Sequence, residues 1–209
     1  MDLSVYFITS NEFGYSHEDI ALMALKGGIK TIQFREKRMS ALKMLETAKR
    51  IRKMCHEFDA TFIVNDRVDV ALASDSDGVH IGQDDLSAED VRRIFDGIVG
   101  VSVNTAEEAV RAEKYADYIG AGPVFRTSTK KDAREVIGIE GLSRIVKAVS
   151  IPVVAIGSIN SENIIRVLET GVDGVAVISA IASSDDPKEE ARKLLKSVRD
   201  YRRNKELRY

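Results

Sequence analysis

The sequence predicts an α/β protein that folds as a single compact (β/α)8 TIM barrel. Short apolar runs recur eight times along the chain, and segments with helical periodicity separate them. Within each run successive residues are apolar, which is typical of strands buried on both faces of a parallel sheet. Eight strand–helix units in 209 residues give a barrel near the lower size limit of this fold.

The eight apolar runs define the predicted strands. They lie at residues 5–9, 31–34, 61–65, 78–82, 98–102, 117–122, 152–157 and 174–179. Helices are predicted to begin after Ser16, Ser87 and Thr105, since each hydroxyl can accept a hydrogen bond from a free N–H of the first helical turn. These start signals fall between the strands, as a strand–helix array requires.

The longest predicted helix lies in "SALKMLETAKRIRKMCHEF". Its buried face is expected to consist of Leu42, Leu45, Ala48, Ile51 and Met54. At the other end of the chain, residues 201–209 are expected to form a charged, solvated tail. Residues 1–209 are otherwise predicted to be one domain, because no linker composition interrupts them.

A doubly wound open sheet is the alternative fold. It predicts fewer strands and a glycine-rich turn after the first one, and "ITSNEFGYS" has no such turn. The strings "GGIKTIQF", "DSDGVHIG", "YADYIGAG" and "GVDGVAVIS" also repeat a pattern of small or acidic residues followed by a strand. Such self-similarity favours the repeating barrel.

Composition excludes several classes of protein. Charged residues make up 31% of the chain but nearly cancel at a net charge of −2, so neither nucleic acid nor a membrane surface is expected as a partner. No apolar run is long enough to span a bilayer. Cys55 is the single cysteine, which favours the reducing cytoplasm. The three histidines are dispersed, so a histidine metal site is not expected.

Polar residues follow seven of the predicted strands. Because active sites of this fold lie at the carboxyl ends of the strands, these residues are expected to meet at one rim. They are Gln33, Arg35 and Lys37; Asn65 and Asp66; Gln83, Asp84 and Asp85; Ser102; Thr127, Ser128, Thr129 and Lys130; Gly157 and Ser158; Ile178 and Ser179.

Structural roles compete with each of these assignments. "QFREK" has the composition of an ordinary solvated loop, and Asp66 is placed to cap the helix in "RVDVALAS". Asp84 and Asp85 precede another helix and are candidates for the same role. Gly157 and Ser158 are compatible with a simple turn, and Ser179 with a helix cap.

The charges of the rim indicate an anionic substrate. Arg35, Lys37 and Lys130 are cations, and Asp66 and Asp85 are carboxylates suited to Mg²⁺, which binds one or two carboxylates together with substrate phosphate oxygens. Such a site would neutralise a pyrophosphate. The loops after strands 7 and 8, with Ser158 and Ser179, are the usual phosphate site of this fold and predict a second anionic group.

The motifs resemble the thiamine-phosphate synthase (thiamine-phosphate pyrophosphorylase) family over nearly the whole chain. The matching strings are "QFREK", "VNDRVDVALA", "DGVHIGQDDL", "GVS", "ADYIGAGPVFRTSTKKDA" and "PVVAIGSI…GVDGVAVISAI". The resemblance implies a (β/α)8 enzyme that condenses 4-amino-2-methyl-5-(diphosphooxymethyl)pyrimidine with a thiazole phosphate and releases pyrophosphate. Partners would therefore be small molecules, and a homo-oligomer is left open.

The resemblance also implies roles for individual residues. Arg35, Lys37 and Lys130 would be catalytic. The pyrimidine diphosphate would contact Gln33, Phe34, Arg35, Glu36, Lys37, Asn65, Ser102 and Lys130. The thiazole phosphate would contact Thr127, Ser128, Thr129, Gly157, Ser158, Ile178 and Ser179. Asp66 and Asp85 would bind Mg²⁺.

Two departures from the family pattern affect these expectations. Ser158 stands where the family usually has a second glycine, and its hydroxyl is expected to donate to phosphate. "SVNT" at residues 102–105 resembles a related thiazole tautomerase in layout, but Asn104 replaces the histidine that would transfer protons there. A tautomerase-like isomerase and a non-catalytic phosphate-binding barrel remain the alternative functions.

Overall fold

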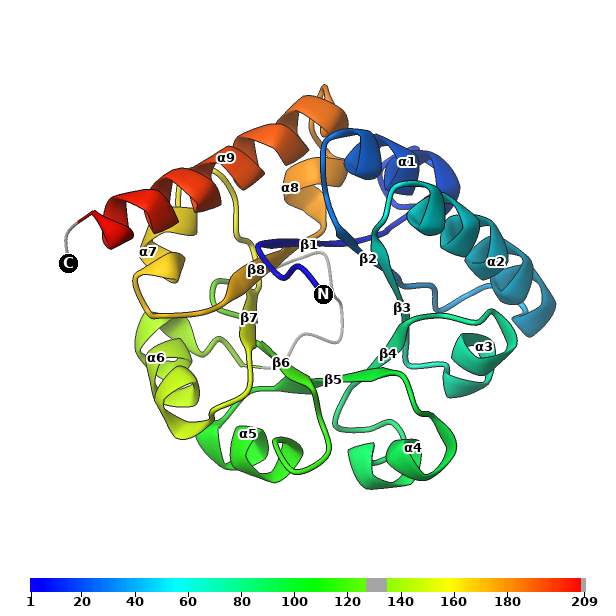
Figure 1. The fold of residues 1–209 in the computed structure, drawn as a ribbon, viewed down its shortest axis with the longest axis horizontal. Coiled ribbons are helices and arrows are strands. Elements are labelled where there is room, and N and C mark those ends of the chain that lie inside the picture. The colour runs from blue at the N-terminus through cyan, green and yellow to red at the C-terminus, as the bar shows by residue number, and fades with distance from the viewer. Residues whose placement is uncertain (127–134, 208–209) are drawn as a thin grey trace.

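The protein is a closed barrel of parallel strands surrounded by helices, which confirms the predicted fold (Figure 1). The computed structural model describes residues 1–126 and 135–207. Each strand pairs with the next along the chain, and β8 closes the barrel by pairing with β1. The strands in this described part of the chain are β1 Val5–Ile8, β2 Thr31–Phe34, β3 Thr61–Asn65, β4 Gly78–Ile81, β5 Ile98–Val103, β6 Tyr118–Ala121, β7 Val153–Ile156 and β8 Gly174–Val177.

Helices connect the strands on the outside of the barrel. Within the described ranges they are α1 His17–Lys26, α2 Ala41–Glu57, α3 Val68–Ala73, α4 Ala88–Ile94, α5 Ala106–Ala112, α6 Gly138–Ala148, α7 Ile164–Leu168, α8 Ser179–Ala182 and α9 Pro187–Glu206. Ser16, Ser87 and Thr105 are the N-caps of α1, α4 and α5, as predicted. Each of these side chains accepts a hydrogen bond from the backbone N–H three residues later.

Alternation along the strands separates two layers of apolar packing. Side chains such as Phe7 and Phe34 pack outward against the helices. A smaller cluster fills the barrel interior and contains Tyr6, Ile8, Ile63, Tyr118, Val154, Ala176 and Ile178. Only the side chains that alternate into the interior can therefore reach a ligand inside the barrel.

The buried face of α2 differs from the prediction. Its buried residues are Met44, Thr47, Ala48, Ile51 and Cys55, whereas Leu42 is 67% exposed. The predicted set repeats every three residues, which rotates around an α-helix by about 60° at each step. Only a mixture of three- and four-residue spacings stays on one face.

The expected C-terminal tail is also corrected, because α9 continues to Glu206. The Tyr201 hydroxyl donates to the carbonyl of Leu168 at 3.2 Å. Arg202 donates to the Ser4 hydroxyl at 2.7 Å and to the carbonyl of Asp173. These contacts hold the end of α9 against the barrel. The charged residues at its end therefore belong to a packed helix and not to a separate tail.

Three aspartates form a repeated contact at the amino ends of the strands. Each stands directly before an even-numbered strand, and its Oδ2 accepts a hydrogen bond from a backbone N–H of the preceding strand. The pairs are Asp77 with Phe62 N at 2.7 Å, Asp117 with Val99 N at 2.8 Å and Asp173 with Val153 N at 2.8 Å. We refer to these as the aspartate clamps. They account for the acidic residue that recurs in the sequence repeats.

Gly100 on β5 leaves space for the buried ring of Tyr118. A Cβ atom at this position would lie 2.1 Å from Tyr118 Cζ. We expect Gly100→Ala to lower the free energy of unfolding by about 2 kcal/mol, because the barrel interior must distort to accept the methyl group. Urea denaturation of the variant measures this loss. The double variant with Tyr118→Leu should be less destabilised than the sum of the single variants; strict additivity would contradict the steric explanation.

Candidate active site

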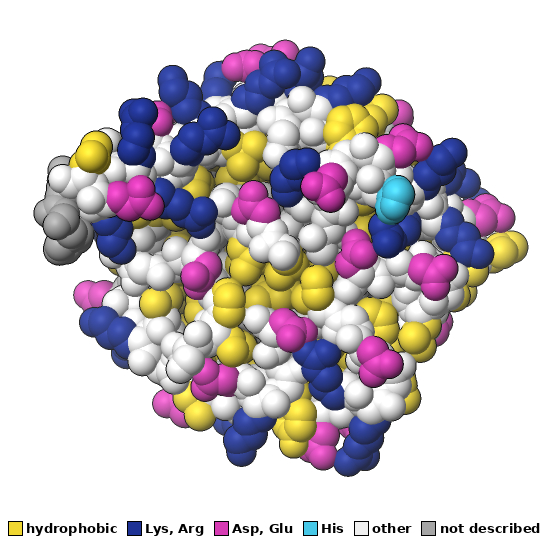
Figure 2. Space-filling view, in the orientation of Figure 1, with side chains coloured by type: hydrophobic (Ala, Val, Ile, Leu, Met, Phe, Trp, Pro, Cys, Tyr) yellow, Lys and Arg dark blue, Asp and Glu magenta, His cyan; other side chains and the backbone are white. Residues whose placement is uncertain are grey.

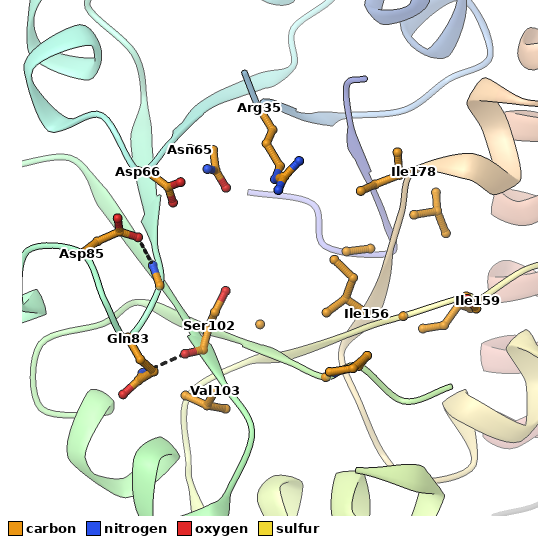
Figure 3. A pocket seen from close by; sticks show the side chains of 18 of the residues that line it. Arg35, Asn65, Asp66, Gln83, Asp85, Ser102, Val103, Ile156, Ile159 and Ile178 are labelled. Carbon is orange, nitrogen blue, oxygen red and sulfur yellow. Dashed lines mark hydrogen bonds between the residues drawn. The ribbon is translucent and has the colours of Figure 1, made fainter. Parts of the chain in front are cut away.

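A pocket of about 230 Å³ opens at the carboxyl ends of β2 to β8. Residues that follow seven strands line it, and the structure therefore brings the predicted rim together (Figure 3). Arg35, Lys37, Asn65 and Asp66 lie on one side, and residues of the β7 and β8 loops lie on the other. The predicted residues Thr127, Ser128, Thr129 and Lys130 lie outside the described part of the chain.

Asp66 and Asp85 form an acidic wall of the pocket. Asp66 follows β3 in a left-handed backbone conformation with φ of 62°, and its carboxyl group lies beside that of Asp85 (Figure 3). Asp85 accepts a hydrogen bond from Gly82 N at 2.7 Å (Figure 3). Burial, and then the neighbouring charge of Asp85, raise the pKa of Asp66 to about 6. Two carboxyl groups held together in this way form an oxygen-rich site for a hard cation.

The capping roles considered for these aspartates do not occur. The N-cap residue of α3 is Arg67, and no side chain caps that helix. The N-cap residue of α4 is Ser87, so Asp84 and Asp85 do not cap that helix. Asp66 and Asp85 are therefore oriented by the pocket and not by the helices that follow them.

The raised pKa of Asp66 predicts a specific pH dependence of stability in metal-free protein. Between about pH 4 and pH 6 the folded state binds a proton that the unfolded chain releases, so stability falls as pH rises through this window. Wild type should lose up to about 3 kcal/mol relative to Asp66→Asn over this range. Urea denaturation of both proteins with chelator at several pH values tests this. Parallel pH curves for the two proteins would contradict it.

The loop after β2 carries the basic side of the pocket. Lys37 Nζ lies 3.8 Å from Asp66 Oδ2, and both Lys37 and Arg35 moderate the pKa of Asp66. Arg35 reaches from this loop into the pocket (Figure 3). Two cations from the β2 loop thus lie next to the carboxylates after β3 and β4, a combination suited to an anion that binds together with a metal ion.

Phe34 and Glu36 of the same motif lie away from the pocket. Phe34 is fully buried in the outer layer, with its ring centroid 4.9 Å from that of His17. Glu36 Oε2 is 3.1 Å from His17 Nε2, and Glu36 Oε1 accepts a hydrogen bond from Arg38 N at 2.5 Å. These two residues shape the loop that carries Arg35 and Lys37, and they are not among the residues that line the cavity; their contacts with substrate stay predictions.

The floor of the pocket is polar. Ser102 lines it, and Ser102 Oγ lies 2.8 Å from Nε2 of His80, a residue that the sequence reasoning did not select. Gln83 donates to the carbonyl of Ser102 at 2.8 Å, and Asn65 is buried beside Asp66. Gln33 lies deeper in the barrel, where its Nε2 donates to the Tyr6 hydroxyl at 2.9 Å. The signal for His80 is its position on β4, where alternation directs it inward.

The opposite side of the pocket contains Gly157, Ser158, Ile178 and Ser179. The Ser158 hydroxyl donates to the carbonyl of Arg126 at 2.7 Å, and its donation to phosphate stays a prediction. Gly157 and Ser158 both have positive φ, at 116° and 49°. Positive φ explains why glycine suits both positions, since a side chain is strained there.

Asn104 has a structural role. Its Nδ2 donates to the carbonyl of Gly122 at 2.9 Å and to the carbonyl of Glu135 at 3.0 Å. Asn104 thus joins the segment after β6 to the segment that begins at Glu135. An amide occupied in this way cannot act as an acid or base, which argues against the tautomerase alternative.

Other classes of site are absent from the described residues. They contain no group of three or more His, Cys, Asp or Glu side chains arranged to hold a metal. None of their helices has both the length and the apolar character needed to cross a bilayer. On the face shown in Figure 2, acidic and basic side chains are interspersed, which matches the near-zero net charge.

Comparisons with known proteins agree in their assignment. A family model described as thiamine monophosphate synthase matches residues 5–181. The thiamine-phosphate synthase of Archaeoglobus fulgidus is 60% identical over 200 residues, covering 96% of this chain and 95% of that protein. The corresponding protein of Pyrococcus abyssi is 50% identical, with 94% and 96% covered. The solved thiamine phosphate pyrophosphorylase of Pyrococcus furiosus superposes with a TM-score of 0.90 at 46% identity, covering 96% of this chain and 97% of that one.

Proposed function

The chain belongs to the thiamine monophosphate synthase family, and from this premise we propose how its pocket carries out the reaction. Its activity is that of a thiamine-phosphate synthase, a transferase. The proposed substrates are 4-amino-2-methyl-5-(diphosphooxymethyl)pyrimidine and a thiazole phosphate. The proposed products are thiamine phosphate and pyrophosphate.

We propose a dissociative substitution. The bond between the pyrimidine methylene carbon and the diphosphate oxygen breaks, and its electron pair leaves with pyrophosphate. The amino group of the ring donates electron density to the resulting cation, and the thiazole nitrogen then supplies the pair for the new C–N bond. This sequence needs alignment and charge stabilisation, and it needs no protein nucleophile.

The basic loop and the acidic wall would hold the leaving group. Arg35 and Lys37 supply fixed positive charge next to Asp66, and Lys130 is proposed from the sequence to join them. Asn65 and Ser102 would orient the pyrimidine from the buried floor. The loops containing Gly157, Ser158, Ile178 and Ser179 would hold the thiazole phosphate through backbone groups.

Asp66 and Asp85 fit a magnesium ion. Their adjacent oxygens are the hard donors that Mg²⁺ prefers, and the remaining coordination positions are available to water and to diphosphate oxygens. The neighbouring charge of Asp85 raises the pKa of Asp66, and a bound cation would relieve this repulsion between the two carboxylates. When bound, Mg²⁺ would add positive charge where the diphosphate departs.

The observation that carries the proposal is the arrangement of one pocket. Cations and a carboxylate pair occupy the wall formed by the ends of β2, β3 and β4. The β7 and β8 loops line the same pocket, which has a volume of about 230 Å³. Two anionic substrates can therefore bind with their reactive parts between them. A cytoplasmic location and assembly into homo-oligomers stay predictions from the sequence.

The test supplies both substrates with Mg²⁺ and follows thiamine phosphate and pyrophosphate together. We expect equal amounts of both products, and no turnover when either substrate is omitted. Product formation that survives complete chelation of divalent ions would contradict the metal assignment. Isomerisation of the thiazole alone, without pyrophosphate release, would support the tautomerase alternative instead.

A further inference from the structure

A chain of hydrogen bonds crosses the barrel interior beneath the pocket. Gln33 Nε2 donates to Tyr6 Oη at 2.9 Å, and Tyr6 Oη lies 2.7 Å from Tyr118 Oη. Tyr118 Oη lies 2.9 Å from His80 Nδ1, and His80 Nε2 lies 2.8 Å from Ser102 Oγ. Five strands contribute, and the two ends are residues already assigned to the pyrimidine substrate. The pocket chemistry described above does not use the three middle residues.

Donor and acceptor capacities fix the direction of this chain. The Gln33 amide nitrogen can only donate, so Tyr6 accepts from it and must give its own hydrogen to Tyr118. Tyr118 then donates to His80 Nδ1, which places the imidazole hydrogen on Nε2 and directs it at Ser102 Oγ. In the reverse direction, the Tyr6 hydroxyl hydrogen would be buried without an acceptor among the described residues, at substantial cost.

The surroundings are built to hold these rings. Tyr6 and Tyr118 are each 1% exposed, and burial raises the pKa of both phenols, so they remain neutral hydroxyl groups. Gly100 makes space for the Tyr118 ring, and a Cβ on Gly120 would lie 2.9 Å from His80 Cε1. The polar chain is thus fixed by close packing on several sides.

We propose that Tyr6, Tyr118 and His80 are positioning residues that set the hydrogen-bonding polarity of the pyrimidine site. They hold the Ser102 hydroxyl as a donor toward the pocket, since it already accepts from His80. At the other end they hold Gln33, whose Oε1 is buried and has no partner among the described residues. One fixed donor and one fixed acceptor complement an aminopyrimidine edge, in which an N–H donor stands beside a ring-nitrogen acceptor. The identity of the substrate in this inference rests on the proposed function. The tautomer assigned to His80 rests only on the hydrogen-bond chain.

The first experiment measures the tautomer of His80 in wild-type protein by ¹⁵N NMR of its imidazole. We expect a neutral ring with hydrogen on Nε2. A neutral ring with hydrogen on Nδ1, or an imidazolium, would overturn the proposal. The NMR measurement does not depend on turnover. If the proposed function is wrong, the assay will show no thiamine phosphate, whatever the tautomer of His80.

The second experiment removes one hydroxyl with Tyr118→Phe and uses Tyr201→Phe as the matched control. Tyr201 also donates a single hydrogen bond, but to the carbonyl of Leu168, outside the pocket. Tyr118→Phe should mix the His80 tautomers and raise KM for the pyrimidine diphosphate about ten-fold, the scale of one lost buried hydrogen bond. Affinity for pyrophosphate with Mg²⁺ should change by less than about two-fold. Equal weakening of pyrophosphate binding would indicate general damage to the pocket and would overturn the proposal. If Tyr118→Phe does not fold, the same measurements apply to Tyr6→Phe.

Discussion

Arg35→Ala is expected to lower the turnover number of the transferase by about 100- to 1,000-fold. Arg35 projects into the pocket next to the acidic wall, where the departing diphosphate would carry its charge. Removal of one preorganised charged donor from such a site costs on this scale, because water in its place must reorganise as the bond breaks. Steady-state kinetics with both substrates saturating measures the loss. Denaturation curves should show that the variant remains folded.

Arg38→Ala is the matched control for this variant. Arg38 belongs to the same loop, and it is exposed and does not line the pocket. Its removal should change turnover by less than about three-fold, as expected of a surface substitution. A wild-type rate in Arg35→Ala would remove this residue from the site. Equal losses in both variants would instead point to a disturbed loop conformation.

Asp66→Asn is expected to weaken Mg²⁺ binding by at least about 100-fold in the presence of pyrophosphate. The substitution keeps the shape of the side chain but removes the charge of one of the two carboxylates that we propose as Mg²⁺ ligands. A loss of several kcal/mol in charge stabilisation follows from the removal of such a ligand. Calorimetric titration of Mg²⁺ measures the affinity directly, and rates at increasing Mg²⁺ show whether high concentrations rescue turnover.

Asp69→Asn provides the control for the proposed metal site. Asp69 lies three residues further along the chain on α3, where it forms an ion pair with Arg67 outside the pocket. This variant should bind Mg²⁺ as wild type does. Unchanged Mg²⁺ affinity in Asp66→Asn would show that the ion, if required, binds elsewhere.

The sequence was a good guide to the barrel because its signals are local. Each strand is a short continuous apolar run, and Ser16, Ser87 and Thr105 begin helices through contacts within a few residues. For α2 the prediction was right at Ala48 and Ile51 and wrong at Leu42, because a three-residue spacing does not match helical rotation. Residues 202–206 are exposed as predicted, but they form the end of α9 and not a separate tail, since charged composition does not reveal contacts such as that of Arg202 with Asp173.

The site was predictable as a set of strand ends and less so residue by residue. Asp66 and Asp85 are adjacent because parallel strands end at the same rim, which follows from topology alone. Phe34 and Glu36 do not line the cavity, because strand alternation turns Phe34 outward and Glu36 pairs with the buried His17. His80 was missed because histidines were considered only as metal ligands, and its partner Tyr118 lies 38 residues away.

The aspartate clamps lie at the opposite end of the barrel from the pocket, and this separation has a consequence for how the protein can change. At that end the three contacts tie β3 to the start of β4, β5 to the start of β6 and β7 to the start of β8, while the substrate-facing loops lie at the other end. Mutational drift or deliberate redesign can therefore exchange the substrate-facing segments without loosening the scaffold. An engineer seeking new ligands would leave Asp77, Asp117 and Asp173 untouched and randomise the other end.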